Sequence, residues 1–359
     1  IYANGWHQLP TSVSGSTFTD NVSDCPGGAI FIGSGALSVG MSTFTGNSTD
    51  GCYGGGAIML DWRATGLTVN ASTFNHNWAD GPGGAILYDA TTGNIVVTSS
   101  AFNENGADGS GGAIAANVEN SQIMTVAGST FTDNSAGDWG GAIDTDCDVV
   151  TCGVTTITRS KFTTNTSDGD GGALDLDGKA NVTNSTFTGN TAEDEGGAIW
   201  ADCEGDGTCA AASTSLTFTG NMFVKNVAHG EGGGAIWSTG SLMIKDNTFR
   251  ANDAIGGGAV WAEGLLPVKS WINANLFDSN TAKAGGALYY EATASNQKLV
   301  INGNRFTGNR AQIGGAVLVD VATVPAALPA AMTRNTFDRN IAGVGGGVAF
   351  SYDGAAYRT

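Results

Sequence analysis

The chain of 359 residues carries a formal net charge of −18, although only 13% of its residues are charged. This acidic balance excludes nucleic acid as a partner, because phosphate binding requires basic patches, and it favours cations or cationic surfaces. The 56 glycines, with abundant Thr and Asn, are poor helix formers that suit strands and turns, so the composition predicts an all-β protein. No apolar run approaches the roughly 20 residues of a transmembrane helix.

A repeated sequence unit runs along the whole chain. Each unit pairs an F-x-x-N motif with a following G-G-A-[ILV], or with G-G-V in the last copy, at a period of about 28 residues. The twelve motif phenylalanines are Phe18, Phe44, Phe74, Phe102, Phe131, Phe162, Phe187, Phe223, Phe249, Phe277, Phe306 and Phe337. A regular array of this kind indicates a repeat architecture rather than a set of independent domains.

Each unit contains short alternating segments without a helical period, which predicts one turn of a parallel β-helix and about twelve coils in all. Stacked at a spacing of about 4.8 Å, the Phe residues would form the spine of the core, at roughly 1.5–3 kcal/mol each. The motif Asn residues are expected to bridge the backbones of successive turns. The paired glycines permit positive φ and close approach between coils.

The charge distribution divides the array into two parts of one solenoid that spans residues 1–359. Residues 1–200 hold 21 acidic and 4 basic residues, which leaves 12 acidic and 11 basic residues for the remainder. We therefore expect acidic coils over 1–202, an inserted loop over 203–215 and near-neutral coils over 216–359.

The pairing of G-G-A-[ILV] with F-x-x-N, repeated in register, resembles the repeats of the chlamydial polymorphic outer membrane protein family. The resemblance covers essentially the whole chain. It implies a right-handed parallel β-helix displayed outside the cell, with adhesion as the usual role. The motif residues are structural, so the resemblance transfers no catalytic residue. Segments typical of a translocator barrel are not found in the sequence, so we expect a passenger region or a relative secreted in another way.

The strand that follows G-G-A is expected to carry one inward and one outward row of side chains. The residue after the Ala is aliphatic in nearly every coil, so the next position points outward. The outward positions combine an acidic patch and an aromatic row: Asp144, Asp146, Asp175, Asp177 and Asp202, then Trp200, Trp237, Trp261 and Tyr289, with Phe350 in the last coil. This combination is typical of a carbohydrate groove, in which rings stack on sugars and carboxylates bind hydroxyls or act as acid and base. Alternatively, the aromatic side chains pack beneath an inserted loop or against another subunit.

A second acidic column follows the motif Asn in the first half of the chain. Its members include Asp24, Asp50, Asp80, Asp108 and Asp168. They are either solvated turn residues or oxygen ligands that hold Ca²⁺ between coils. Because neither a D-x-D-x-D-G loop nor a calcium-binding nonapeptide occurs, we assign no metal site. We expect no cofactor. If the acidic column binds an ion, we expect that ion to be Ca²⁺.

Six cysteines form three pairs that are close in sequence: Cys25–Cys52, Cys147–Cys152 and Cys203–Cys209. Without the His residues or tight C-x-x-C clusters of a metal site, they predict disulfides and a location outside the reducing cytosol. Sequons for N-glycosylation begin at Asn21, Asn47, Asn70, Asn165, Asn181 and Asn184, and are used only if the source organism glycosylates its proteins.

We expect an extracellular or cell-surface structural and adhesive protein that presents a β-helix face to glycans, other surface proteins or neighbouring subunits. No catalytic residue is assigned, because His7, His76 and His229 have no evident partner for a nucleophilic triad. The alternative is a polysaccharide-processing β-helix enzyme, a lyase or glycosidase, that uses Asp144, Asp146, Asp175 and Asp177.

Overall fold

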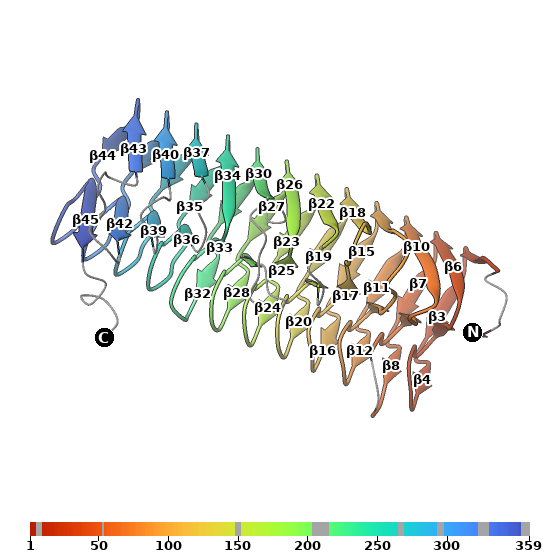
Figure 1. Cartoon of the computed structure of the whole chain (residues 1–359). Helices are drawn as coiled ribbons and strands as arrows, with labels where there is room; N and C mark the ends of the chain where they lie inside the picture. Colours follow the sequence, from red (N-terminus) through yellow and green to blue (C-terminus); the bar gives the residue numbers. More distant parts are fainter. Residues whose placement is uncertain are drawn as a thin grey trace.

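A computed structural model describes residues 1–4, 9–51, 54–147, 152–202, 215–264, 269–292, 298–321 and 330–352. Within these ranges every regular element is a β-strand and every pairing between strands is parallel, so the predicted parallel β-helix is confirmed. The chain winds through about 11 turns, and its ends lie at opposite ends of the solenoid (Figure 1). A helix with the length and apolarity to cross a membrane is not found in the same ranges.

Each turn contributes one strand to each of sheets A, B and C, and the earlier turns also contribute a short strand to a fourth sheet, D; all four sheets are parallel. Sheet A has 13 strands: β1 (Tyr2–Ala3), β5 (Ile30–Ile32), β9 (Ile58–Leu60), β13 (Ile86–Tyr88), β17 (Ile114–Asn117), β21 (Ile143–Asp146), β25 (Leu174–Asp177), β29 (Ile199–Asp202), β33 (Ile236–Thr239), β36 (Val260–Gly264), β39 (Leu288–Ala292), β42 (Val317–Val321) and β45 (Val348–Tyr352). Sheet B has 12: β2 (Thr11–Ser14), β6 (Gly35–Gly40), β10 (Ala64–Asn70), β14 (Ile95–Thr98), β18 (Ile123–Ala127), β22 (Val154–Thr158), β26 (Lys179–Thr183), β30 (Ser215–Thr219), β34 (Ser241–Lys245), β37 (Lys269–Asn273), β40 (Lys298–Asn302) and β43 (Ala330–Thr333).

Sheets C and D come from the segment around each F-x-x-N motif. Sheet C has 12 strands: β3 (Thr17–Thr19), β7 (Thr43–Thr45), β11 (Thr73–Asn75), β15 (Ala101–Asn103), β19 (Thr130–Thr132), β23 (Lys161–Thr163), β27 (Thr186–Thr188), β31 (Met222–Val224), β35 (Thr248–Arg250), β38 (Leu276–Asp278), β41 (Arg305–Thr307) and β44 (Thr336–Asp338). Sheet D has eight short strands: β4 (Val22–Ser23), β8 (Ser48–Thr49), β12 (Trp78–Ala79), β16 (Gly106–Ala107), β20 (Ser135–Ala136), β24 (Thr166–Ser167), β28 (Thr191–Ala192) and β32 (Val227–Ala228). In later coils sheet D continues as single bridges, beginning with Val227 to Asp253.

The twelve motif phenylalanines form the spine of the core. Each is the middle residue of a sheet C strand and points inward, and those from Phe44 to Phe306 are fully buried. Successive rings stack with centroids 4.7–5.0 Å apart and interplanar angles of 2–10°. This column is the largest repeated apolar contribution to the fold, at roughly 1.5–3 kcal/mol per ring.

The motif asparagines form a continuous hydrogen-bonded ladder beside the Phe column. Asn134 is typical: its Nδ2 donates to the carbonyl oxygen of Phe102 at 3.1 Å and to Oδ1 of Asn165 at 2.9 Å. The backbone N–H of Asn134 donates to the same Oδ1 at 3.1 Å. The side chains therefore satisfy buried backbone groups at the turn where the sheet hydrogen bonds stop.

A second ladder, at the turn from sheet B to sheet C, continues across the change in charge. In the acidic coils the side chain of a serine accepts a hydrogen bond from the backbone of the preceding coil. For example, the backbone N–H of Ser160 donates to Oγ of Ser185 at 3.1 Å. The backbone N–H of Ser185 then donates to Oδ1 of Asn221 at 2.9 Å, and asparagines carry the ladder onward. Sheets A, B and C likewise run without interruption from the acidic coils into the near-neutral ones.

The two glycines of each G-G-A motif have different physical roles. The first, such as Gly83 with φ of 74°, adopts the left-handed conformation that side-chain-bearing residues rarely take. The second, such as Gly84, lies against the neighbouring coil, where a Cβ would collide with the backbone carbonyl of Gly112. The G-G pair is therefore fixed by turn geometry and by coil-to-coil distance, as predicted.

Two of the predicted glycosylation sites are wrong. Asn47 and Asn165 belong to the Asn ladder, are fully buried, and use Nδ2 for two hydrogen bonds each. A glycan on that nitrogen would break the ladder and would have no space. The sequons at Asn21, Asn70, Asn181 and Asn184 stay predictions.

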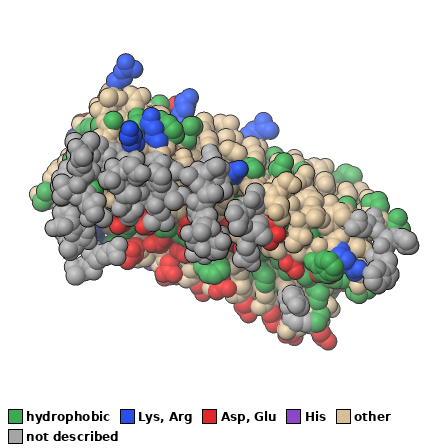
Figure 2. Space-filling view, viewed as in Figure 1, with side chains coloured by type: hydrophobic (Ala, Val, Ile, Leu, Met, Phe, Trp, Pro, Cys, Tyr) green, Lys and Arg blue, Asp and Glu red, His purple; other side chains and the backbone are tan. Residues whose placement is uncertain are grey.

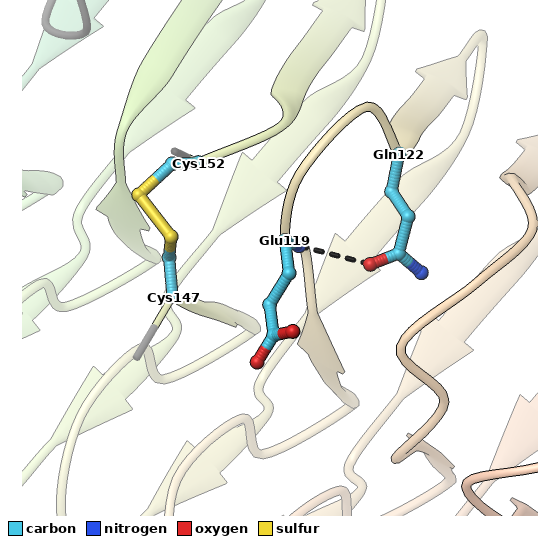
Figure 3. Close-up of a disulfide and its surroundings, with 4 residues drawn as sticks. All are labelled: Glu119, Gln122, Cys147 and Cys152. Atoms are coloured by element: carbon cyan, nitrogen blue, oxygen red, sulfur yellow. Dashed lines mark hydrogen bonds between the residues drawn. A yellow bond between two sulfur atoms is a disulfide. The ribbon is translucent and has the colours of Figure 1, made fainter. Parts of the chain in front are cut away.

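One of the predicted disulfides is confirmed. Cys147 and Cys152 are bonded, with their Cα atoms 5.6 Å apart, and join the end of β21 to the coil's return toward β22 (Figure 3). They lie beside the turn in which the backbone N–H of Glu119 donates to Oε1 of Gln122 at 2.9 Å. The pairings Cys25–Cys52 and Cys203–Cys209 involve positions outside the described residues and stay predictions.

Replacing a central ladder residue, Asn134→Ala, is expected to lower the free energy of unfolding by at least about 3 kcal/mol. The change leaves the backbone N–H and side-chain amide of Asn105 without their acceptor, and each buried unpaired group costs about 1–3 kcal/mol. Urea denaturation followed by circular dichroism measures the loss. The matched change Asn21→Ala, at the exposed end of the same ladder, should cost much less. Equal losses would contradict the role assigned to the buried ladder.

Candidate functional site

The predicted acidic and aromatic residues lie in one row on the outer face of sheet A. The register pairs each with the next along the axis: Asp144 with Asp175, Asp175 with Trp200, Trp200 with Trp237, Trp237 with Trp261, and Trp261 with Tyr289. A parallel row two residues further along the strands pairs Asp177 with Asp202. The structure thus brings these residues together in the order expected from the sequence.

The aromatic row is largely covered, which favours the packing alternative over an open carbohydrate groove. The side chains point away from the core of the coil, but Trp200, Trp237 and Tyr289 are only 9%, 7% and 6% exposed, and Trp261 is half-buried. The reason is that the segment between sheets D and A folds back over the outer face of sheet A. Ala284 and Ile313 from this segment pack with Tyr289 in a small apolar cluster outside the main core.

The rings of the row also cover one another. Trp200 and Trp237 stack with centroids 5.2 Å apart and an interplanar angle of 3°. Trp261 meets the edge of Tyr289 at 4.4 Å and 83°, and the Tyr289 hydroxyl donates to Oδ2 of Asp320 at 3.0 Å. Because the ring faces are occupied by neighbouring rings, Trp200 and Trp237 do not offer a stacking platform to a sugar.

The placement of Phe350 in the outward row is also wrong. Val348 pairs with Val317, so Ala349 occupies the outward position and Phe350 pairs with Val319. The last motif reads Gly345-Gly346-Gly347-Val348, in which a third glycine replaces the usual Ala. Taking the last two glycines as the motif pair shifts the assignment by one residue, and a shift of one reverses the face of a strand.

The outward acids lie at the point where the aromatic row begins. Burial, followed by the nearby charges of Asp144 and Asp146, raises the pKa of Asp177 to about 9. Burial and the charges of Asp146 and Asp138 also hold the pKa of Asp144 well above its usual range. Asp175 is only 5% exposed, whereas Asp146 is exposed. Several carboxyl groups therefore share a small, partly dehydrated area in which not all of them are ionised at neutral pH.

Sequence reasoning missed another buried carboxyl group on this side of the molecule, Glu195, which lies against Trp200. Burial, followed by the charges of Asp170 and Glu231, raises its pKa to about 8, against a lowering by its hydrogen bond with Trp200. Its backbone N–H donates to Oδ1 of Asp170 at 2.8 Å. Both acids stand directly before a G-G pair, and that position was the available signal. We name Asp144, Asp146, Asp177 and Asp202 the carboxyl strip.

The Trp261 indole carries an unpaired donor further along the aromatic row. Its Nε1 is buried and has no hydrogen-bond partner among the described residues. Gly232 and Gly256 lie against the Trp261 ring, so that a Cβ at either position would contact it. Buried donors are normally paired in folded proteins, so this N–H is an exception within the row.

The second acidic column lies apart from the strip. Asp24, Asp50, Asp80, Asp108 and Asp168 are exposed and follow the short strands of sheet D, where acidic side chains line the lower edge of the molecule in Figure 2. Within the described ranges no group of three or more His, Cys, Asp or Glu is arranged to hold a metal ion. The exposure of the column fits solvated turn residues, and Ca²⁺ between coils stays an untested alternative.

Two histidines have acidic partners that the sequence did not reveal. His76 lies 2.9 Å from Glu104 and His229 lies 3.1 Å from Glu193, each pair joining adjacent coils. All four side chains are more than half exposed, so these are surface ion pairs that contribute little to stability. His7 lies outside the described residues.

Comparison with protein families agrees with the fold. The family model of the right handed beta helix region matches residues 148–344, more than half of the chain, and the chain belongs to this family. Before that region, the model of the Chlamydia polymorphic membrane protein repeat matches residues 15–33 and 128–146, each with an F-x-x-N motif and its G-G-A. The resemblance to these repeats is confirmed. No curated protein and no solved structure gives a significant match.

The raised pKa of Asp177 makes stability depend on pH. A carboxyl whose pKa rises from 3.8 to about 9 on folding stabilises the native state fully below pH 4, and this contribution is lost as pH rises toward 9. The slope for one group is at most about 1.4 kcal/mol per pH unit, reduced by solvent screening. Asp177→Asn should flatten this fall and unfold at higher temperature than wild type at pH 8. Thermal melts at pH 5, 7 and 9 measure the effect, and parallel curves for the two proteins would contradict it.

Proposed function

We propose that this chain is an extracellular, cell-surface adhesive protein whose solenoid presents the carboxyl strip to glycans. The β-helix and the polymorphic membrane protein repeats fit a surface repeat protein. The observation that carries the glycan proposal is the strip itself: acids from three successive coils gathered on one face at the start of the aromatic row.

The chemistry of the strip suits sugar hydroxyl groups. A carboxyl group that is protonated at neutral pH, such as Asp177, donates a hydrogen bond, and an ionised one accepts hydrogen bonds. A hydroxyl group both donates and accepts, so it can match both states. Hydrogen bonding rather than ring stacking is the expected mode, because Trp200 and Trp237 cover each other.

A glycan array with the full chain tests this function. Wild type should bind a subset of neutral glycans, and Asp146→Asn combined with Asp177→Asn should remove most of that binding. The control is Asp50→Asn, which removes an exposed acid of the other column and should leave binding unchanged. Equal binding by the double variant and wild type would sink the assignment of the strip. Protein that elutes as a defined oligomer with a protected strip would instead make this face an assembly surface.

A polysaccharide-processing enzyme is the second candidate, favoured by the pKa of Asp177 alone. A general acid must hold its proton at the working pH, and a carboxyl group with a pKa of about 9 does so beside the exposed Asp146. In this mechanism Asp177 protonates the leaving oxygen of a glycosidic bond while an ionised neighbour activates water or stabilises the sugar cation.

A polysaccharide-degradation screen by reducing-sugar assay separates the two candidates. If the chain is an enzyme, it should release reducing sugar ends, and Asp177→Asn should abolish this release. The release should also fall at alkaline pH, because Asp177 then loses its proton. The adhesive reading expects no release from any polysaccharide that the chain binds. Activity that survives Asp177→Asn unchanged would exclude the mechanism written here.

A further inference from the structure

The outer face of sheet C in the acidic coils is a regular array of threonines. Each of the strands β3, β7, β11, β15, β19, β23 and β27 has two outward residues that flank the inward Phe. Ten of these 14 positions are threonine: Thr17, Thr19, Thr43, Thr45, Thr73, Thr130, Thr132, Thr163, Thr186 and Thr188. We name these seven strands' outward surface the threonine face.

The threonines are aligned in two columns along the solenoid axis. Thr17 pairs with Thr43 and Thr43 with Thr73 in one column, while Thr19 pairs with Thr45 in the other. Parallel strands lie about 4.8 Å apart and alternate residues of a strand about 6.6 Å apart. The hydroxyl and methyl groups therefore repeat with these spacings, except where Asn75, Ala101, Asn103 and Lys161 take the threonine positions.

The threonine face is flat, because the phenylalanines beneath it keep the strands from twisting. Between Phe18 and Phe187, successive rings have interplanar angles of only 2–5° and centroids 4.7–4.9 Å apart. Neighbouring strands in an ordinary sheet rotate by about 20–25°, and flat sheets require stacking of this kind. A lattice on such a face stays in step over all seven strands.

The face is uncharged although the coils that carry it are strongly acidic. Lys161 is its only charged member, whereas residues 1–200 contain 21 acidic residues elsewhere. None of the ten threonine hydroxyls makes a side-chain hydrogen bond within the described part of the chain. The face thus complements a partner that is flat, neutral, periodic and rich in hydrogen-bonding oxygen.

The near-neutral coils show that the fold does not require these threonines. There sheet C keeps the same stacked Phe column, yet its outward residues include Met222, Arg250, Leu276, Asp278 and Arg305. The threonine face ends where the acidic coils end. Threonine takes ten of 14 outward positions in the acidic coils but three of ten in the later coils, and strand propensity alone would not concentrate it in one half of a uniform sheet.

We propose that the threonine face binds the surface of ice. A flat array of hydroxyl and methyl groups at spacings of about 4.8 Å and 6.6 Å can hold water molecules at repeating positions between successive threonines, as binding to an ice surface requires. The methyl groups exclude disordered water, and the flat neutral face lets many weak contacts act together. A glycan is a poorer partner, because the face has no aromatic side chain on which a sugar ring could stack. This activity goes beyond the proposed adhesion, which uses sheet A.

Partition of the full chain into growing polycrystalline ice, together with inhibition of ice recrystallisation, tests the proposal. Wild type should enter the ice, and Thr43→Lys should lose most of that partition because its long charged side chain stands inside the array. Thr248→Lys is the matched control. It occupies the same column of sheet C but lies between Met222 and Leu276, outside the threonine face, and should partition like wild type. Circular dichroism and thermal midpoints should be alike for both variants, since both positions face outward.

A gain of activity provides an independent arm. Lys161 interrupts the column between Thr130 and Thr186, so Lys161→Thr should increase partition into ice above the wild-type level. Exclusion of wild type from ice, equal partition by Thr43→Lys and wild type, or no gain from Lys161→Thr would each overturn the proposal. Pull-downs with crystalline cellulose and chitin form a parallel arm. Retention on either polymer that depends on Thr43, without entry into ice, would replace ice by a crystalline polysaccharide.

Discussion

The stacking of identical side chains at the spacing of parallel strands is the constraint on which the rest of the molecule depends. A coil of about 28 residues cannot enclose a core by itself, so every apolar group must meet its own copy in the coils on either side. The Phe column and the Asn ladder satisfy this requirement together. The rings remove apolar surface from water, and the amides satisfy the backbone groups that the turns leave unpaired. Their common register leaves no freedom for one coil to slip against the next.

Because the inward positions fix the fold, the outward positions of different sheets can differ in chemistry. On sheet A the segment from sheet D covers the outward row, so acids and aromatic rings there are held at low exposure. That dehydration, more than the charge of any one neighbour, raises the pKa of Asp177 and Glu195. On sheet C nothing comparable buries the outward residues, and small polar side chains remain accessible in a regular pattern.

The division of the array into two halves is a change of surface and not of fold. The ladder at the turn between sheets B and C changes from serine to asparagine at Ser185 and Asn221, and its hydrogen bonds continue across the junction. The largest angle between successive rings of the Phe column, 10°, occurs at the same place, between Phe187 and Phe223. The ladder tolerates the exchange of serine for asparagine because both side chains are short and form hydrogen bonds. The two halves therefore share one continuous core, although their surface charges differ.

The sequence by itself determined the solenoid, because a motif repeated twelve times fixes the coil length and the inward face. It also aligns equivalent residues of successive coils with one another. It also determined the order of Asp175, Trp200 and Trp237 along the outer face, since register follows from the repeat. It did not determine their exposure. Whether an outward side chain meets water depends on the path of the segment between sheets D and A, which is irregular and has no periodicity to interpret. The pKa of Glu195 and the flatness of the threonine face were likewise decided only by the tertiary structure, where neighbouring coils set the dielectric environment and the twist.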